Sequence, residues 1–163
     1  MQRISKENYY LDIAQTVLER ATCLRRVYGA IIVKNDEIIS TGYNGAPRGR
    51  RNCVDMGYCT REQLRVPRGE RYELCRSVHA EANAIISAAR RDMIGGTLYL
   101  VGRSAADGEL LHDTTSCAMC RRMIINSGIT RVVNRIGDDG IEIIDVQNWI
   151  VNDESIQPKA EAE

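Results

Sequence analysis

Two short motifs in this chain of 163 residues place metal-binding side chains at spacings that suit zinc. The first is His79-Ala-Glu81, and the second is Cys117-Ala-Met-Cys120. Zinc prefers nitrogen and thiolate ligands in a tetrahedral arrangement, and a catalytic site keeps one position open for water. His79, Cys117 and Cys120 are therefore the predicted ligands of a catalytic zinc ion. Glu81 follows the histidine by two residues, close enough to contact that water without binding the metal.

The chemistry expected of these four residues is hydrolysis of an amino group on a nucleobase. Zinc lowers the pKa of a bound water to about 7. Glu81 would take a proton from this water, pass it to a ring nitrogen and then protonate the departing ammonia. His-x-Glu together with Cys-x-x-Cys is typical of zinc nucleobase deaminases. Taken alone, the histidine could be a packed core residue and the cysteines a redox pair, but a redox pair leaves His79 and Glu81 unexplained.

The surrounding segments predict a single α/β domain over residues 1–151 that positions these motifs, followed by a flexible tail over 152–163. A helix from the N-cap Ser5 should reach about residue 22, and strands at 29–34 and 37–42 should form a hairpin. Residues 44–77 are expected to be irregular, with a short helix. A second helix should begin near residue 77 and end before Gly95. A third should run from the N-cap Ser116 to about residue 127, with Gly128 as its C-cap. Further strands are expected at 97–101, 131–134 and 141–146.

Composition narrows the function classes. The 22 basic and 22 acidic residues give a formal net charge of +0, and aromatic residues make up 5% of the chain, so a nucleic-acid partner is not expected. No signal-like or membrane-spanning run is visible, which predicts a cytoplasmic protein without a membrane partner. In that reducing compartment the 6 cysteines favour metal ligation or catalysis over disulfides, although any one of them could be a small buried apolar residue.

From about residue 5 to residue 133 the chain resembles the deoxycytidylate (dCMP) deaminases of the cytidine-deaminase superfamily. The resemblance lies in residues 23–33, 39–49, 79–85, 117–120 and 123–128. It implies a three-layer α/β/α sandwich with a mixed five-stranded sheet. It also implies zinc-dependent hydrolysis of dCMP to dUMP and ammonia, supplying dUMP for thymidylate synthesis. Two alternatives stay open: a related deaminase acting on dCTP or another cytosine or guanine compound, and a non-catalytic zinc-stabilised binding module, which Glu81 opposes.

The resemblance further implies residues that bind nucleotides. Asn44 would hydrogen-bond the substrate near its sugar, and Arg90 would help to neutralise the phosphate, unless it is a solvated cation paired with Asp92. Many relatives are hexamers that dCTP activates and dTTP inhibits. The candidate effector-binding residues in a homo-oligomer, either a hexamer or a dimer, are Gly42, Tyr43, Asn44, Gly45 and Arg48. The arginines near this segment could equally belong to an exposed loop.

The remaining four cysteines suggest a second zinc ion. Cys23 and Cys53 match positions that bind a structural zinc in some family members, and Cys59 and Cys75 would complete a four-thiolate site. Such a site would tie the irregular segment to the end of the first helix. Two departures from the family concern the active site. Ser116 stands where the family has proline, although its hydroxyl can still cap the helix, and the loop 103–115 is longer than expected.

Overall fold

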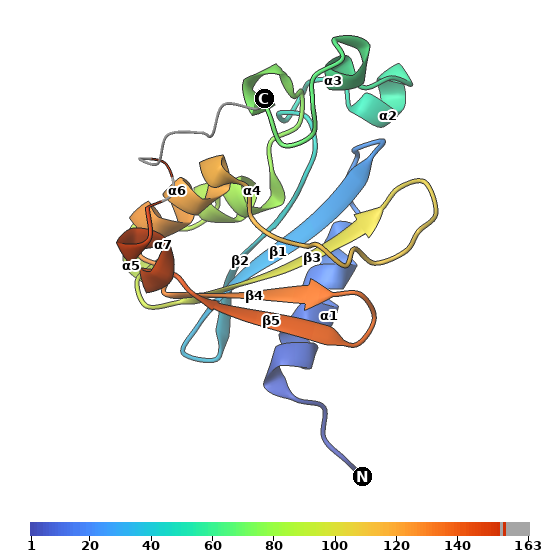
Figure 1. Ribbon diagram of the computed structural model, residues 1–163. Helices are drawn as coiled ribbons and strands as arrows, with labels where there is room; N and C mark the ends of the chain where they lie inside the picture. The colour runs from blue at the N-terminus through green and yellow to red at the C-terminus, as the bar shows by residue number, and fades with distance from the viewer. Residues whose placement is uncertain (154, 156–163) are drawn as a thin grey trace, which may run out of the picture.

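A mixed five-stranded sheet runs through the middle of the molecule (Figure 1). The computed structural model describes residues 1–153 and residue 155. The strands are β1 (Arg26–Lys34), β2 (Glu37–Tyr43), β3 (Thr97–Ser104), β4 (Arg131–Ile136) and β5 (Gly140–Asp145). Their order is β2-β1-β3-β4-β5, in which β3 and β4 are parallel and the other neighbours are antiparallel. The β1–β2 hairpin turns through Asn35 and Asp36, both with positive φ, as the sequence predicts.

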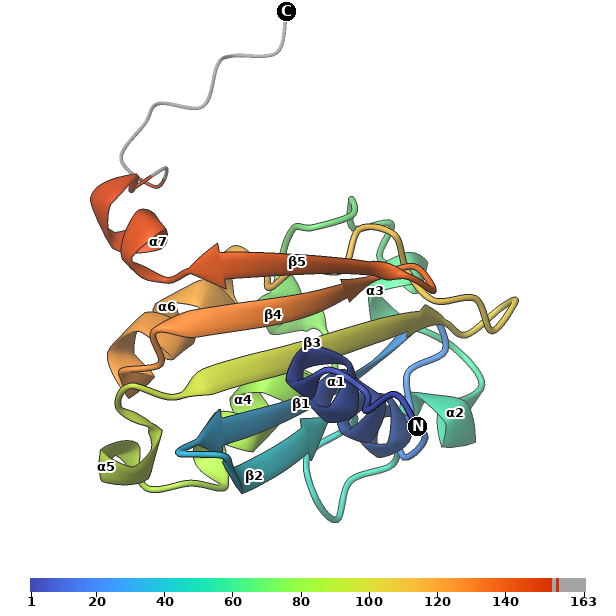
Figure 2. The ribbon, with the colours of Figure 1, turned by 90° about the horizontal axis from the view of Figure 1, so that it is seen from below.

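Helices cover both faces of the sheet (Figure 2). On one face lies α1 (Lys6–Leu18), which packs its buried residues against β1 and β3. On the other face lie α4 (Ala80–Ile86) and α6 (Ala118–Ser127), with α5 (Arg90–Met93) and α7 (Gln147–Val151) beside them. Two apolar clusters, one on each side of the sheet, form the core. The predicted three-layer α/β/α sandwich is confirmed.

Glycine allows two helices to lie directly on the sheet. A Cβ atom on Gly42 of β2 would lie 2.3 Å from the Ala80 carbonyl oxygen and 2.4 Å from the Ala84 nitrogen of α4. A Cβ atom on Gly29 of β1 would lie 2.1 Å from the Ala14 carbonyl oxygen of α1. Both positions therefore require the absence of a side chain because backbone meets backbone.

Two of the predicted helices differ from the structure. The first ends at Leu18 and not near residue 22, because the Thr22 N–H donates to the Asn44 carbonyl and draws the chain away from the helix. The single helix predicted between residue 77 and Gly95 is two helices. Ala89 is extended between α4 and α5, and this break turns the chain so that Met93 enters the core with 3% exposure.

The segment between β2 and α4 contains only short elements, as expected from its glycines, prolines and arginines. These are α2 (Cys53–Met56), α3 (Thr60–Gln63) and the 3-10 turn η1 (Tyr72–Leu74). Most of the predicted tail, residues 154 and 156–163, lies outside the described residues, and the domain boundary at 151 stays a prediction. Within the part of the chain that the structure describes, no helix is long and apolar enough to span a membrane.

Candidate metal centre and nucleotide pocket

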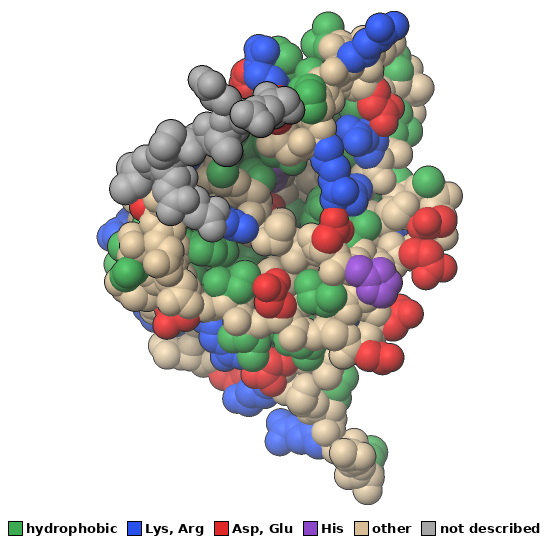
Figure 3. Space-filling view, viewed as in Figure 1, with side chains coloured by type: hydrophobic (Ala, Val, Ile, Leu, Met, Phe, Trp, Pro, Cys, Tyr) green, Lys and Arg blue, Asp and Glu red, His purple; other side chains and the backbone are tan. Residues whose placement is uncertain are grey.

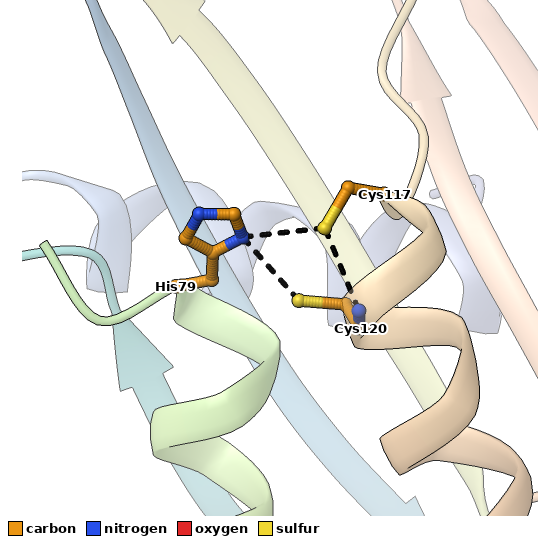
Figure 4. Close-up of side chains that lie close together, drawn as sticks. All are labelled: His79, Cys117 and Cys120. Carbon is orange, nitrogen blue, oxygen red and sulfur yellow. Dashed lines mark hydrogen bonds between the residues drawn. The ribbon is translucent and has the colours of Figure 1, made fainter. Parts of the chain in front are cut away.

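The three predicted zinc ligands meet where α4 and α6 begin (Figure 4). His79 is the N-cap of α4, Cys117 is the N-cap of α6, and Cys120 lies one turn into α6. Nδ1 of His79 is 3.5 Å from the Cys117 sulfur and 3.4 Å from the Cys120 sulfur. Zn–S bonds of about 2.3 Å and Zn–N bonds of about 2.0 Å in a tetrahedral site require an N···S separation of about 3.5 Å. The donor atoms therefore fit zinc in both type and spacing.

The charges of these ligands depend on one another. A hydrogen bond with Cys120 is the main cause that lowers the pKa of Cys117 to about 4, and contacts with His79 and the Cys120 N–H add to it. The Cys117 thiolate in turn raises the pKa of Cys120. Burial opposes a charge on His79, but hydrogen bonds with Cys117 and Cys75 outweigh it and raise the His79 pKa to about 10. The site thus favours an anionic sulfur facing a cationic partner, the electrostatic arrangement that a divalent metal satisfies.

Glu81 lies in the first turn of α4 and is 5% exposed. Burial raises the pKa of its carboxyl group, and the Glu81 charge helps to raise the pKa of Cys120, which places the carboxyl group beside the ligand pair. Within the described residues Glu81 forms no ion pair with Lys or Arg. A buried carboxyl group without a basic partner costs stability, and such groups are common at catalytic sites.

Ser116 does not cap α6, and that expectation is wrong. The Cys117 sulfur takes the capping role by accepting from the Cys120 N–H at 3.5 Å. The Ser116 side chain is 1% exposed, and its hydroxyl has no hydrogen-bond partner within normal geometric limits. It nevertheless lies near enough to the Glu81 carboxyl group to affect its pKa. Ser116, which stands where the resemblance leads one to expect a proline, therefore lies beside the Glu81 carboxyl group.

A cavity of about 510 Å³ is lined by His79, Cys117 and Glu81, and Figure 3 shows a hollow on this face with basic side chains beside it. This volume is within the usual range for small-molecule sites. Five arginines line the cavity: Arg25, Arg26, Arg61, Arg68 and Arg121. Sequence reasoning did not single them out. Arg121 could have been predicted from the sequence, because it follows Cys117 by four residues and so lies on the same face of the helix.

Asn44 lines the same cavity, as a nucleotide-binding role requires. Its side-chain oxygen accepts from the Tyr28 N–H at 2.8 Å, and its amide nitrogen donates to the Arg26 carbonyl at 2.9 Å. An asparagine amide has two donor hydrogens and two acceptor lone pairs. One of each is left for a ligand, so the predicted contact is compatible with these bonds.

Arg90 does not line this cavity. Its Nε donates to the Asn126 carbonyl at 2.8 Å, in a separate depression between α4, α5 and α6. The alternative pairing with Asp92 is also not formed in the described residues, where Asp92 lies 3.9 Å from Arg91. This arrangement favours Arg26, Arg68 and Arg121 over Arg90 as cations for a phosphate in the cavity.

The candidate effector residues lie beside the start of α4. Gly42 meets the α4 backbone, and the Tyr43 carbonyl accepts from the Asn83 side chain at 2.8 Å. Gly45 pairs with Val78 through two backbone hydrogen bonds, and Arg48 is exposed. Packing accounts for Gly42 in this segment, and the effector role of these residues, with Asn44, stays a prediction.

The other four cysteines gather near the same cavity. Cys23, Cys59 and Cys75 line it, and Cys53 is buried. Burial is the main cause that raises the pKa of Cys53, and the other three cysteines raise it further, so the four thiols are neighbours. In the described part of the chain, the only group of three or more His, Cys, Asp or Glu side chains whose ligand atoms all lie within 4.8 Å of one another is His79, Cys117 and Cys120. The four-thiolate site stays a prediction.

Residues 4–135 match the sequence model of the family described as "Cytidine and deoxycytidylate deaminase zinc-binding region". The chain belongs to this family. All three candidate zinc ligands and Glu81 lie inside the matched segment. The resemblance read from the sequence is therefore confirmed.

Individual members of the family differ in length. A deoxycytidylate deaminase of Mycobacterium phage D29 is 37% identical over 138 residues, which cover 82% of this chain and 96% of the phage protein. A deoxycytidylate deaminase of Schizosaccharomyces pombe is 34% identical over 131 residues, which cover 80% of this chain and 37% of the yeast protein. This chain therefore spans little more than a third of the length of the yeast relative.

A solved structure is also similar. The crystal structure of dCMP deaminase from the cyanophage S-TIM5 in complex with dCMP and dUMP superposes with a TM-score of 0.55 at 25% identity. The superposition covers 82% of this chain and 84% of that chain.

Proposed function

We propose that this protein is a zinc-dependent deaminase that hydrolyses dCMP to dUMP and ammonia. The observation that carries the proposal is the set of one nitrogen and two sulfurs at zinc-ligand spacing with the buried Glu81 carboxyl group beside it. Deoxycytidylate deaminase activity in the D29 phage relative, which this chain matches over almost its whole length, supports dCMP as the substrate.

Each residue of the site would have its own role in the reaction. Zinc held by His79, Cys117 and Cys120 would supply a nucleophile from water at neutral pH. Glu81 accepts the proton of that water and delivers it to the ring nitrogen next to the amino-bearing carbon, which makes this carbon electrophilic. The water oxygen adds to this carbon, and Glu81 takes the second proton from the added hydroxyl group and transfers it to the amino group. The carbon–nitrogen bond then breaks, so that ammonia leaves and a carbonyl remains.

The cavity can hold the rest of the nucleotide. Arginine forks bind phosphate oxygens with two hydrogen bonds, and Arg26, Arg68 and Arg121 line the cavity. Arg121 is already oriented, because its Nε donates to the Ser116 carbonyl at 3.0 Å. Asn44 offers its free donor and acceptor to the sugar. Binding of a nucleotide phosphate would explain why the cavity is lined by arginines although the protein has a formal net charge of +0.

Ammonia release over dCMP, dCTP, CMP, deoxycytidine and guanine tests the proposal. We expect the highest kcat/KM on dCMP, and a fall in kcat of about 10³-fold or more in Glu81→Gln with unchanged zinc content. A preference for dCTP or guanine would instead identify the related deaminase. Zinc binding without turnover of any compound would identify a non-catalytic binding module.

We further propose that Cys23, Cys53, Cys59 and Cys75 hold a structural zinc ion. Two buried polar atoms without partners support this site. They are the Ser77 hydroxyl, near Cys53, and Nε of Arg61. Arg61 is 6% exposed, has no ion-pair partner in the described residues, and exerts a charge effect on Cys75. Thiolates on zinc would supply the missing negative charge. Two zinc ions per chain in the wild type and one in Cys53→Ser would support the site, whereas one in both would refute it.

The finer expectations from the family resemblance complete the proposal. We expect the dUMP product to supply thymidylate synthesis in the cytoplasm. We also expect a homo-oligomer, either a hexamer or a dimer, that responds to dCTP and dTTP. Light scattering gives the oligomer mass. Unchanged rates on adding dCTP or dTTP at subsaturating dCMP would exclude the regulation.

A further inference from the structure

The mouth of the cavity carries one acidic residue between two arginines. Asp113 accepts from Nη1 of Arg26 through both carboxylate oxygens, at 3.2 and 3.3 Å. Nη2 of Arg68 donates to the same carboxylate. All three residues line the cavity. Arg26 lies at the start of β1, Arg68 in the irregular segment and Asp113 in the loop before α6. The carboxylate thus connects three separate parts of the chain, and these three residues are called the rim of the cavity below.

The carboxylate affects both the position and the charge of the arginines. Two guanidinium groups that share one partner stay close together, where they would otherwise repel each other. Burial raises the pKa of Asp113, but the two arginines outweigh this effect and keep the pKa below its ordinary value of 3.8. Asp113 is therefore charged at neutral pH, and the three residues carry a net charge of plus one. A ligand with a modest negative charge suits this rim better than a highly charged one.

We propose that Asp113 is a specificity-determining residue that restricts the cavity to nucleoside monophosphates. It holds Arg26 and Arg68 in place for a single phosphate, and its own charge disfavours the added phosphoryl groups of a triphosphate. The inference rests on the proposed function and deepens it, because it names the feature that separates dCMP from dCTP. It also gives a role to the loop 103–115, which is longer than the family resemblance leads one to expect.

The size of the effect follows from partial exposure. The side chains of Asp113, Arg26 and Arg68 are 51%, 33% and 64% exposed. Like charges a few ångströms apart at such positions are screened by water, and their repulsion changes binding by about tenfold and not by several orders of magnitude. Removal of the Asp113 charge should therefore raise the ratio of kcat/KM for dCTP to kcat/KM for dCMP by about tenfold.

Asp113→Asn tests the proposal because it keeps the shape of the side chain and one acceptor oxygen. We expect the dCTP/dCMP ratio to rise about tenfold, mainly through a lower KM for dCTP, with unchanged zinc content. Asp113→Glu retains the charge and should keep the ratio within about twofold of wild type. The matched control is Asp139→Asn, which removes one exposed charge from the β4–β5 turn, away from the cavity, and should not change the ratio.

Two results would overturn the proposal. In the first, Asp113→Asn leaves the ratio unchanged. In the second, it lowers kcat/KM for both nucleotides equally, which is the result expected if Asp113 only fixes the loop. Failure of the proposed function is separable, because wild-type protein would then not deaminate dCMP at all. If the charge of the rim acts on phosphate, Arg68→Gln should raise KM for dCMP and leave KM for deoxycytidine unchanged.

Discussion

Replacement of Gly42 by alanine tests how closely catalysis depends on the contact between β2 and α4. The added Cβ atom would lie 2.3 Å from the Ala80 carbonyl oxygen, whereas Cβ contacts under 3.0 Å are essentially never seen. The obstructing atoms belong to the helix backbone, so no rotamer change relieves the contact. To restore 3.0 Å, α4 must move away from β2 by at least 0.7 Å.

This displacement reaches the reacting groups directly. His79 caps α4 and Glu81 lies in its first turn, so both move with the helix. A misplacement of about 1 Å can cost about 100-fold in rate, and overpacking costs about 1–3 kcal/mol of stability. We expect Gly42→Ala to lose about 10- to 100-fold in kcat/KM for dCMP and about 2 kcal/mol in the free energy of unfolding.

The assay is steady-state ammonia release, combined with urea unfolding and zinc analysis of the same preparations. Gly49→Ala is the control, because φ at Gly49 is +85° and an added Cβ atom meets nothing within 4 Å. It should lose about 1 kcal/mol of stability through backbone strain and keep the wild-type rate on dCMP. The reasoning is refuted if Gly42→Ala retains kcat/KM within twofold. If its basal rate is normal but its response to dCTP is lost, Gly42 serves the effector site and not the packing of α4.

Substitutions at three buried polar residues, one of them compared with its exposed partner, give further predictions. Arg135→Met should lower the free energy of unfolding by about 2 kcal/mol, because the Arg135 side chain is 7% exposed and donates hydrogen bonds to three residues of α1. Asp12→Asn should lower it by less than about 1 kcal/mol, because the Asp12 side chain is 56% exposed. Equal losses in urea unfolding would contradict this difference. Ser116→Ala should raise the free energy of unfolding by about 1 kcal/mol, since it removes a buried hydroxyl without a partner, and a loss of stability would show that the hydroxyl is hydrogen-bonded. Burial in the folded protein raises the pKa of Glu81 above 4.5 and so favours its neutral form. Zinc-free Glu81→Gln should therefore be more stable than zinc-free wild type at pH 8, and urea unfolding should show this difference shrink as pH falls toward 4.5 and nearly vanish below it.

The grouping of the three candidate zinc ligands could be predicted from sequence because each motif fixes its side chains locally. Cys117 and Cys120 lie on one helix at i and i+3, and His79 and Glu81 share the first residues of another. The helices α4 and α6 precede the parallel neighbours β3 and β4, so both helices begin at the same end of the sheet. The two motifs together therefore predict one site.

The cations of the cavity could not be found in this way. Arg26, Arg68 and Arg121 come from a strand, an irregular segment and a helix, and only long-range packing brings them together. Arg90 is the first residue of α5, after the break at Ala89, and its side chain donates to the Asn126 carbonyl instead of entering the cavity. The break accompanies the burial of Met93, a long-range contact that the spacing of alanines in the sequence does not reveal.

The candidate zinc ligands and the other cysteines lie on elements of different kinds, and this difference affects which parts of the protein unfold together. His79, Cys117 and Cys120 are fixed by helices that share the central core with β1 and β3. Cys53, Cys59 and Cys75 lie at the ends of the short elements α2, α3 and η1, and their approach to Cys23 closes a long loop at a cost in chain entropy. Amides of residues 53–75 should therefore exchange with deuterium through local opening, while those of β1 and β3 exchange through global unfolding. One wall of the cavity would then be a separate cooperative unit, which can open to admit a nucleotide while the metal ligands remain in place.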